Sequence, residues 1–301
     1  MDQRLLTFVT VAEEKSFTKA AQVLHITQPA VTQHIQNLEN DFNVSLLDRG
    51  KRTVTLTKAG HIVYHQAKQI LTYYNETKRL VDELIYEDSG SMVISSSYTF
   101  GEYILPYVLK EFQIRYPRVS FMVNIVNSDD VIHQVQNREA DIGIVETEIS
   151  SSENLKAVPF FEDTVSFFAA SNHNFYTGEG PTIEELSRQT WILREKGSGT
   201  RKVTEKALEE FGIIPAHTLE LGSIQIIKEA VEAGLGISAL SNWTVHKELS
   251  LNTLKLVNPE NLSLQRSFSY IYLPAEWQTK TIQLFADCLN KISSLKRNNS
   301  V

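Results

Sequence analysis

The sequence has only one cysteine, Cys288, among its 301 residues. A single thiol forms no internal disulfide bond, which fits a reducing compartment. Cys288 lies in the helical, apolar run 282–289, so we expect a buried small apolar side chain there and no redox sensor. No stretch approaches the roughly 18 uninterrupted apolar residues that a membrane helix needs, and the first residues lack a signal-peptide pattern. We therefore expect a cytoplasmic protein that binds no membrane.

Motifs of enzymes are missing as well. Neither Gly-x-Ser-x-Gly nor His-Glu-x-x-His occurs, and there is no glycine fingerprint of dinucleotide binding. The eight histidines are scattered without the spacing of metal ligands, so we interpret them as surface or capping residues. These absences argue against an enzyme, which stays the weaker alternative, and they predict neither a cofactor nor a metal.

Positive charge is scarce overall, because the net charge is −7, and this at first argues against a nucleic-acid partner. Residues 1–60, however, hold seven basic and six acidic side chains, whereas the rest of the chain holds 22 basic and 30 acidic ones. The acidity therefore belongs to the larger C-terminal part, which we do not expect to face DNA. The length suits two or three domains.

Two short helices are predicted in the N-terminal part. Ser16 is a good N-cap for a helix over residues 17–24, and Thr27 caps a second helix that has Pro29 in its first turn. A helix enters the major groove of DNA, where glutamine can form two hydrogen bonds with adenine and threonine can reach base edges. The predicted base-reading residues are the outward polar side chains of the second helix, Gln28, Thr32 and Gln33, followed by Gln36.

Residues near the starts of these two helices, and a hairpin after them, are predicted to bind the DNA backbone. Ser16 and Thr27, with the free amides of the helix starts and Pro29 beside them, are predicted to contact phosphates. Residues 46–57 alternate at their end like a strand around a basic tip that contains a glycine, which predicts a hairpin wing. The wing carries Arg49, Lys51 and Arg52 toward phosphates or a minor groove. The alternative is a helical bundle whose outward glutamines are merely solvated.

The order and spacing of these segments resemble the LysR-type transcriptional regulators. The matching runs are FTKAA (17–21), LHITQPAVT (24–32), LE (38–39), LLDR (46–49) and LTKAG (56–60). The resemblance implies an α/β protein with an N-terminal winged helix-turn-helix over residues 1–60 and a long linker helix over 58–87. It further implies a two-lobed effector domain over 91–301 that is similar to periplasmic binding proteins.

The linker helix predicts a homodimer. Thr57 is a suitable cap, no proline interrupts residues 58–87, and such a helix would span about 45 Å. Its apolar stripe cannot be buried on the head alone, so we expect the stripe to pair with a second copy, with packing on its own sensor domain as the alternative. Two heads would then bind two half-sites of an operator in double-stranded DNA. The resemblance implies further assembly into tetramers. The stripe consists of Ala59, Val63, Ala67, Ile70, Tyr74, Thr77, Val81 and Leu84.

The C-terminal part alternates between strand-like and helix-like segments after a polar boundary at 88–91, which predicts an α/β domain with largely parallel sheets. Expected strands cover 92–96, 119–126, 141–145, 164–170, 191–194, 236–240 and 268–273. The resemblance places two hinge crossings near 162–166 and 266–270. Lobe I then takes 91–164 and 268–301, and lobe II takes 165–267. The same lobes would fit a solute-binding transport protein, but the missing signal sequence and the attached head argue against one.

The effector is expected between the lobes, at the carboxyl ends of strands. Three hydroxyl-bearing or glycine-bearing loops, at 96–99, 194–201 and 221–223, precede helices and suit an anion, although each could simply cap its helix. Arg201 opposite Glu146 leaves room for an anionic or amino-acid-like effector. The 197–201 loop is similar to that of regulators of sulfur assimilation and carbon fixation. The predicted effector-binding residues are Ser97, Tyr98, Thr99, Ser128, Glu146, Thr147, Ser198, Gly199, Thr200 and Arg201.

Overall fold

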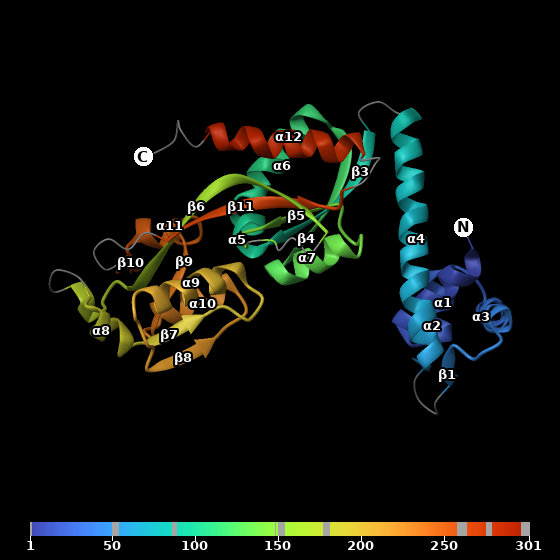
Figure 1. Cartoon of the computed structure of the whole chain (residues 1–301), viewed down its shortest axis with the longest axis horizontal. Coiled ribbons are helices and arrows are strands. Elements are labelled where there is room, and N and C mark those ends of the chain that lie inside the picture. Colours follow the sequence, from blue (N-terminus) through green and yellow to red (C-terminus); the bar gives the residue numbers. More distant parts are fainter. Residues whose placement is uncertain are drawn as a thin grey trace. The chain divides into compact units, whose positions relative to one another are not determined.

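The structure is a computed structural model that describes residues 2–49, 54–85, 89–147, 149, 154–176, 181–257, 264–274 and 279–295. The chain forms two compact units, Met1–Leu84 and Ile85–Val301 (Figure 1). Each unit has its own buried core. Among the described helices, none is long and apolar enough to cross a membrane.

The first unit is a small helical head with a hairpin and one long helix. Its two predicted capping residues behave as expected: Ser16 Oγ accepts from the amide of Lys19 at 3.3 Å, and Thr27 Oγ1 accepts from the amide of Ala30 at 3.4 Å. The elements are α1 (Gln3–Glu14), α2 (Phe17–Val23), α3 (Gln28–Phe42), β1 (Leu47–Arg49), β2 (Val54–Leu56) and α4 (Lys58–Ile85).

A compact core fixes α3 against the other helices. Small side chains let the helices approach closely, since Ala20 and Ala21 of α2 are buried beside Val31 and Ile35 of α3. β1 and β2 pair antiparallel, as the predicted wing requires, and the tip of this hairpin, residues 50–53, lies outside the described residues. The predicted winged helix-turn-helix is confirmed.

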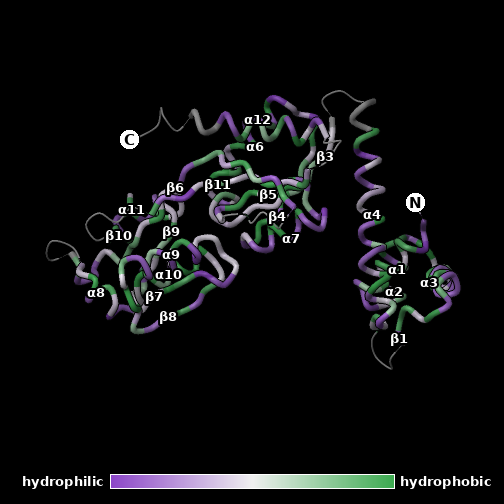
Figure 2. Tube along the Cα trace, viewed as in Figure 1, coloured by the Kyte–Doolittle hydropathy of each residue, from purple (hydrophilic) through white to green (hydrophobic). Residues whose placement is uncertain are grey.

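Helix α4 buries only the first part of its predicted apolar stripe. Thr57 Oγ1 caps it by accepting from the Gly60 amide at 3.0 Å, and Ala67 packs against Val9 of α1. The head covers the first turns of the stripe, and as expected it does not bury the whole of it. Further along, Ile70 is 53% exposed and Tyr74 is 48% exposed, so apolar surface remains uncovered within the unit. Figure 2 shows hydrophobic and hydrophilic positions mixed along α4.

The second unit is built on one nine-stranded sheet in the described part of the chain, with strand order β4-β3-β5-β11-β6-β9-β7-β8 and β10 beside β6. β3 begins at Ser89, inside the predicted boundary. β8 and β10 were not predicted, because β8 lacks an apolar alternation and β10 has only three residues. The strands are β3 (Ser89–Ser97), β4 (Arg118–Val126), β5 (Ile142–Val145), β6 (Lys156–Ala170), β7 (Thr190–Leu193), β8 (His217–Glu220), β9 (Ile237–Ser241), β10 (Leu254–Leu256) and β11 (Leu264–Tyr272).

The expected parallel sheet is only partly present. β3 pairs parallel with β4 and β5, and β7 pairs parallel with β8 and β9. The two long strands β6 and β11 are antiparallel to each other, because the chain leaves the first lobe along β6 and returns along β11. β11 also pairs with β5 of lobe I, and β6 also pairs with β9 of lobe II, so the two strands connect the lobes. The hinge positions near 162–166 and 266–270 stay a prediction.

Helices cover both faces of the sheet in each lobe. In lobe I, α5, α6 and α12 pack around Phe100, Phe112 and Phe285, and α7 covers the opposite face. In lobe II, α8 and α9 pack on one face, and α10 and α11 pack on the other. Cys288 of α12 is buried, as predicted. The helices are α5 (Tyr98–Tyr103), α6 (Leu105–Arg115), α7 (Ser128–Gln136), α8 (Ile183–Ser187), α9 (Gly199–Glu210), α10 (Ile224–Glu232), α11 (Asn242–Leu251) and α12 (Lys280–Leu295), with a 3-10 turn at Asn174–Tyr176.

Candidate DNA-binding head and interlobe cleft

One polar face of α3 is exposed. Gln28, Pro29, Gln33 and Gln36 are exposed, and Thr32 is partly buried. Gln28 Nε2 donates a hydrogen bond to Thr32 Oγ1 at 3.0 Å, and that hydroxyl donates to the Gln28 carbonyl at 3.2 Å. Side chains one helical turn apart are thereby held on a common face, which is the arrangement that reading base edges needs.

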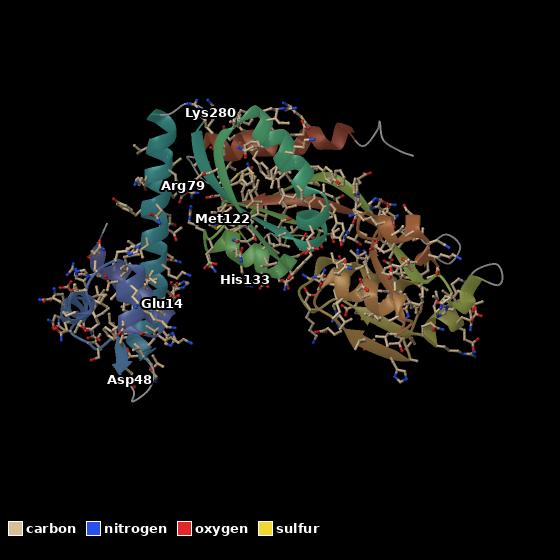
Figure 3. The ribbon with its side chains drawn as sticks, turned by 180° about the vertical axis from the view of Figure 1, so that it is seen from behind. Glu14, Asp48, Arg79, Met122, His133 and Lys280 are labelled. Atoms are coloured by element: carbon tan, nitrogen blue, oxygen red, sulfur yellow. The ribbon has the colours of Figure 1, made fainter. Side chains whose placement is uncertain are left out.

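The predicted backbone-contacting residues surround this face. Ser16 and Thr27 stand at the amide-rich starts of α2 and α3, where helix ends attract anions. Arg49 ends β1, next to Asp48, which Figure 3 labels on that strand. Lys51 and Arg52 lie outside the described residues.

His34 has a structural role that the sequence analysis missed. Its Nδ1 lies 2.9 Å from Oγ1 of Thr7, a fully buried residue of α1. The interpretation of every histidine as a surface or capping residue is therefore wrong here. The signal was present, because His34 lies three residues after Val31 and four before Leu38, on the buried stripe of α3.

The cleft between the two lobes gathers strand ends and helix starts. β3 ends at Ser97 and is followed by α5, β5 ends just before Glu146, and α7 and α9 begin at Ser128 and Gly199. Such ends supply free amides and hydroxyls to a common point. The predicted effector-binding residues that are buried here are Ser97, Thr99, Ser128, Glu146, Ser198, Gly199 and Thr200.

A buried arginine lies at the centre of this cleft. Arg266 of β11 donates from Nε to Asp163 Oδ2 at 2.7 Å and from Nη1 to Thr200 Oγ1 at 2.9 Å. Its Nη2 lies 3.4 Å from Thr99 Oγ1. Since Thr99 belongs to lobe I and Thr200 to lobe II, one guanidinium contacts both walls of the cleft. Ser241 holds Asp163 in turn, by donating to Oδ1 at 2.6 Å.

Three side-chain oxygens in the cleft have no hydrogen-bond partner among the described residues. They are Oγ of Ser97, Oγ of Ser128 and Oε2 of Glu146, and all three residues are buried. The other oxygen of Glu146, Oε1, lies 3.6 Å from Nη1 of Arg266, which is too long for a hydrogen bond. Buried polar atoms are nearly always satisfied in native proteins, so a water or another polar molecule is expected at these three atoms.

The two lobes touch along the rim of the cleft. The Asp129 amide donates to the Gly197 carbonyl at 3.2 Å, and Lys202 Nζ lies 2.7 Å from Asp129 Oδ1. A Cβ at Gly199 would stand 2.6 Å from Cγ of Glu146, so only glycine permits this approach. Gly199 thus lies against Glu146 and Ser128, two of the residues that have an unpartnered oxygen.

Comparison with known proteins shows to which family this chain belongs. A family model described as bacterial regulatory helix-turn-helix protein, lysR family, matches residues 3–61, and a model of the LysR substrate binding domain matches residues 87–292. The chain belongs to the LysR family of transcription regulators. It is 38% identical to the HTH-type transcriptional regulator CysL of Bacillus subtilis, with 95% of each chain covered. It is 32% identical to a probable RuBisCO transcriptional regulator of Porphyra purpurea, over 92% of this chain and 89% of that one.

Solved structures of LysR-family proteins share the fold. A full-length OxyR variant from Pseudomonas aeruginosa superposes with a TM-score of 0.69 at 20% identity, covering 96% of this chain and 94% of that one. CbnR in complex with its target DNA has a TM-score of 0.73 at 18% identity, covering 97% and 99%. The regulatory domain of Synechocystis PCC6803 CcmR in complex with 2-PG has a TM-score of 0.62 at 27% identity, covering 70% and 98%. The predicted fold and family resemblance are confirmed.

One expectation about the cleft of this LysR-family regulator is wrong. Arg201 does not face Glu146, because its guanidinium binds the carboxylates of Glu205, at 2.7 Å, and Glu220, and donates to the Arg194 carbonyl at 2.8 Å. These partners lie within lobe II and hold the side chain at the start of α9. The arginine opposite Glu146 is Arg266.

Two further predicted residues border the cleft. The Arg194 guanidinium lies 4.7 Å from the centre of the Tyr98 ring and pairs with Glu195 at 2.7 Å, so Tyr98 helps to join the lobes. Thr147 is partly buried after Glu146. The third predicted loop, 221–223, is tied to β7 by a backbone hydrogen bond from Leu221 to Leu193 at 2.9 Å.

Arg266, Asp163 and Ser241 were not predicted, although the expected hinges lie beside the first two. Arg266 is the one charged residue of the run LQRSFSYIY, whereas the run FFEDTVSFF holds two acidic residues, Glu162 and Asp163. Charged residues are almost never fully buried unless they are paired. The sequence therefore offered a signal for a buried pair at the hinge without showing which carboxylate binds Arg266.

Proposed function

We propose that this regulator binds a specific operator in double-stranded DNA and that a small anionic or amino-acid-like effector, bound between the lobes, controls it. The exposed face of α3, with the paired side chains Gln28 and Thr32, supports sequence-specific binding. The unpartnered oxygens of Ser97, Ser128 and Glu146 support the effector site. Because its DNA lies there, the protein acts in the cytoplasm in this proposal.

Dimerisation is part of the same proposal. The head carries a charge of only +1 over residues 1–60, so phosphate attraction from a single head is weak. The apolar side chains of α4 that remain exposed in the head unit, Ile70, Tyr74 and Val81, supply a surface for α4 of a second copy. Two heads then bind two half-sites, and further pairing into tetramers follows the expectation from the family.

A gel shift with the purified full-length chain tests this function. DNA fragments from upstream of its own and neighbouring genes are incubated with the protein, with and without small metabolites, in excess non-specific DNA. We expect retardation of at least one fragment and a change in its extent with a metabolite. Failure to retard any fragment under all conditions would overturn the regulator proposal.

The oligomeric state is tested on the same preparation. Tyr74→Asp puts a charge into the proposed helix pair, whereas Tyr107→Asp changes an exposed tyrosine of α6 and serves as the control. Sedimentation should show a smaller particle for Tyr74→Asp only. A control that dissociates equally would contradict pairing through α4.

Enzyme and transport-protein functions are the alternatives. The curated relatives in the comparison are named transcriptional regulators. In the described part of the chain, no group of three His, Cys, Asp or Glu residues could hold a metal ion. A metabolite that is bound unchanged, together with a DNA complex that responds to it, favours the regulator over both alternatives.

A further inference from the structure

The buried charges of the cleft do not balance. Arg266 is neutralised by Asp163, since Nε and Oδ2 lie 2.7 Å apart and both side chains are almost fully buried. Glu146 adds a second carboxylate whose side chain is only 2% exposed, and it reaches Arg266 no closer than 3.6 Å. Two carboxylates around one guanidinium leave an excess negative charge. A buried charge without a full partner is costly, so Glu146 needs a positive group.

Neighbouring cations in the protein are engaged elsewhere. Arg194 pairs with Glu195, and Lys202 pairs with Asp129 on the rim. Arg201 is held by two other carboxylates, those of Glu205 in α9 and Glu220 in β8. None of these three side chains donates to Oε2 of Glu146, so a molecule bound in the cleft can supply that donor.

Hydroxyl groups of the cleft offer donors to an anion. Thr99 and Thr200 accept hydrogen bonds from Arg266, so each hydroxyl keeps its own proton to donate. Ser97 Oγ and Ser128 Oγ are buried without a partner among the described residues, and Ser128 opens the nine-residue helix α7. Hydroxyls and the start of a helix together suit a carboxylate.

We propose that the effector is a zwitterion of the α-amino acid class, with its ammonium group on Glu146 and its carboxylate on the hydroxyls of Ser97, Thr99 and Ser128. This inference rests on the proposed function, because it assigns the ligand of the same cleft. A zwitterion differs from an anion that has no ammonium group. Such an anion would leave Glu146 unpaired and would be repelled by its carboxylate.

The test compares ligands that differ only in the ammonium group. The full-length protein is titrated by calorimetry with the standard L-amino acids, with the matching 2-hydroxy acids and with inorganic phosphate. At least one amino acid should bind, and its hydroxy acid should bind on the order of tenfold more weakly or worse, as expected for a lost hydrogen bond to a charged group. Hydroxy acids or phosphate that bind as well as the amino acids, or no binding by any amino acid, would overturn the zwitterion.

Substitution of Glu146 tests whether its carboxylate binds the ligand or only supports the structure. Glu146→Gln keeps the shape but removes the charge, so amino-acid affinity should fall about tenfold while phosphate affinity should rise or stay unchanged. The matched control is Glu229→Gln on the exposed side of α10, which should change neither. Equal loss for both ligands in Glu146→Gln would indicate a structural role and overturn the assignment.

The same preparations separate this inference from the proposed function. A chain that retards its operator but binds no amino acid refutes the zwitterion and leaves the DNA-binding regulator intact. A chain that binds an amino acid but retards no DNA refutes the regulator and leaves the ligand class intact.

Discussion

Arg266 and Asp163 are direct partners across β11 and β6, with Nε of the arginine 2.7 Å from Oδ2 of the aspartate. Both lie on the strands that run between the lobes, and the guanidinium also reaches a threonine of each lobe. The pair therefore forms part of the hinge and of the cleft. A change in what the cleft binds can act on the strands that set the angle between the lobes.

Removing one member of this pair should destabilise the C-terminal unit strongly. Asp163→Ala leaves the Arg266 charge buried without its hydrogen-bonded partner, and we expect a loss of about 3 kcal/mol in the free energy of unfolding. Urea melts followed by tryptophan fluorescence measure this unit alone, because all three tryptophans lie beyond residue 190.

The double variant Asp163→Leu with Arg266→Met is the control for this prediction. Apolar replacement of a whole buried ion pair is often neutral or stabilising, so the double variant should regain most of the lost free energy. It should still fail to respond to an effector, since the group that contacts both walls is gone. A double variant as unstable as Asp163→Ala would contradict the interpretation of the pair.

Substitution of a base-reading residue and of a phosphate-binding residue should change DNA binding in different ways. Gln28→Ala should cost roughly 1 to 3 kcal/mol of operator affinity and relax the base preference, whereas Lys51→Ala should weaken binding to all sequences and flatten its salt dependence. Fluorescence anisotropy at several salt concentrations, with operator and scrambled DNA, measures both effects. Asn40→Ala, exposed at the other end of α3, is the control. Identical behaviour of Gln28→Ala and Lys51→Ala would refute the groove assignment.

The head was more predictable from the sequence than the cleft, for a physical reason. Caps such as Ser16 and Thr27 act on amides two or three residues away, so local sequence contains the whole interaction. Arg266 and Thr99 are 167 residues apart and meet only through the return of β11 beside β6. Sequence predicted loops with the right chemistry but could not predict which charges face each other, and it placed Arg201 where Arg266 lies.

Cys288 should react slowly with thiol reagents in the folded protein. Burial in lobe I raises the pKa of its thiol, so at a given pH less of the reactive thiolate is present, and the side chain is also shielded. Titration with a coloured disulfide reagent at pH 8 should be slower by on the order of a hundredfold than in urea, because reaction waits for opening of the core. The unfolded chain, which should yield one thiol, is the control. Complete reaction of the native protein within minutes would contradict a buried Cys288.

We expect the two lobes to close fully only while residue 199 is a glycine, which has no side chain. Gly199→Ala places a Cβ 2.6 Å from Cγ of Glu146, and since this carbon is packed between the lobes, closure should cost about 1 to 3 kcal/mol. Gly222→Ala is the matched control, because its nearest atom would be 4.0 Å away on Glu195. Small-angle scattering of the full-length chain should show more open lobes, and calorimetry should show weaker effector binding, for Gly199→Ala only. If both variants match the wild type, the contact between Gly199 and Glu146 does not control closure.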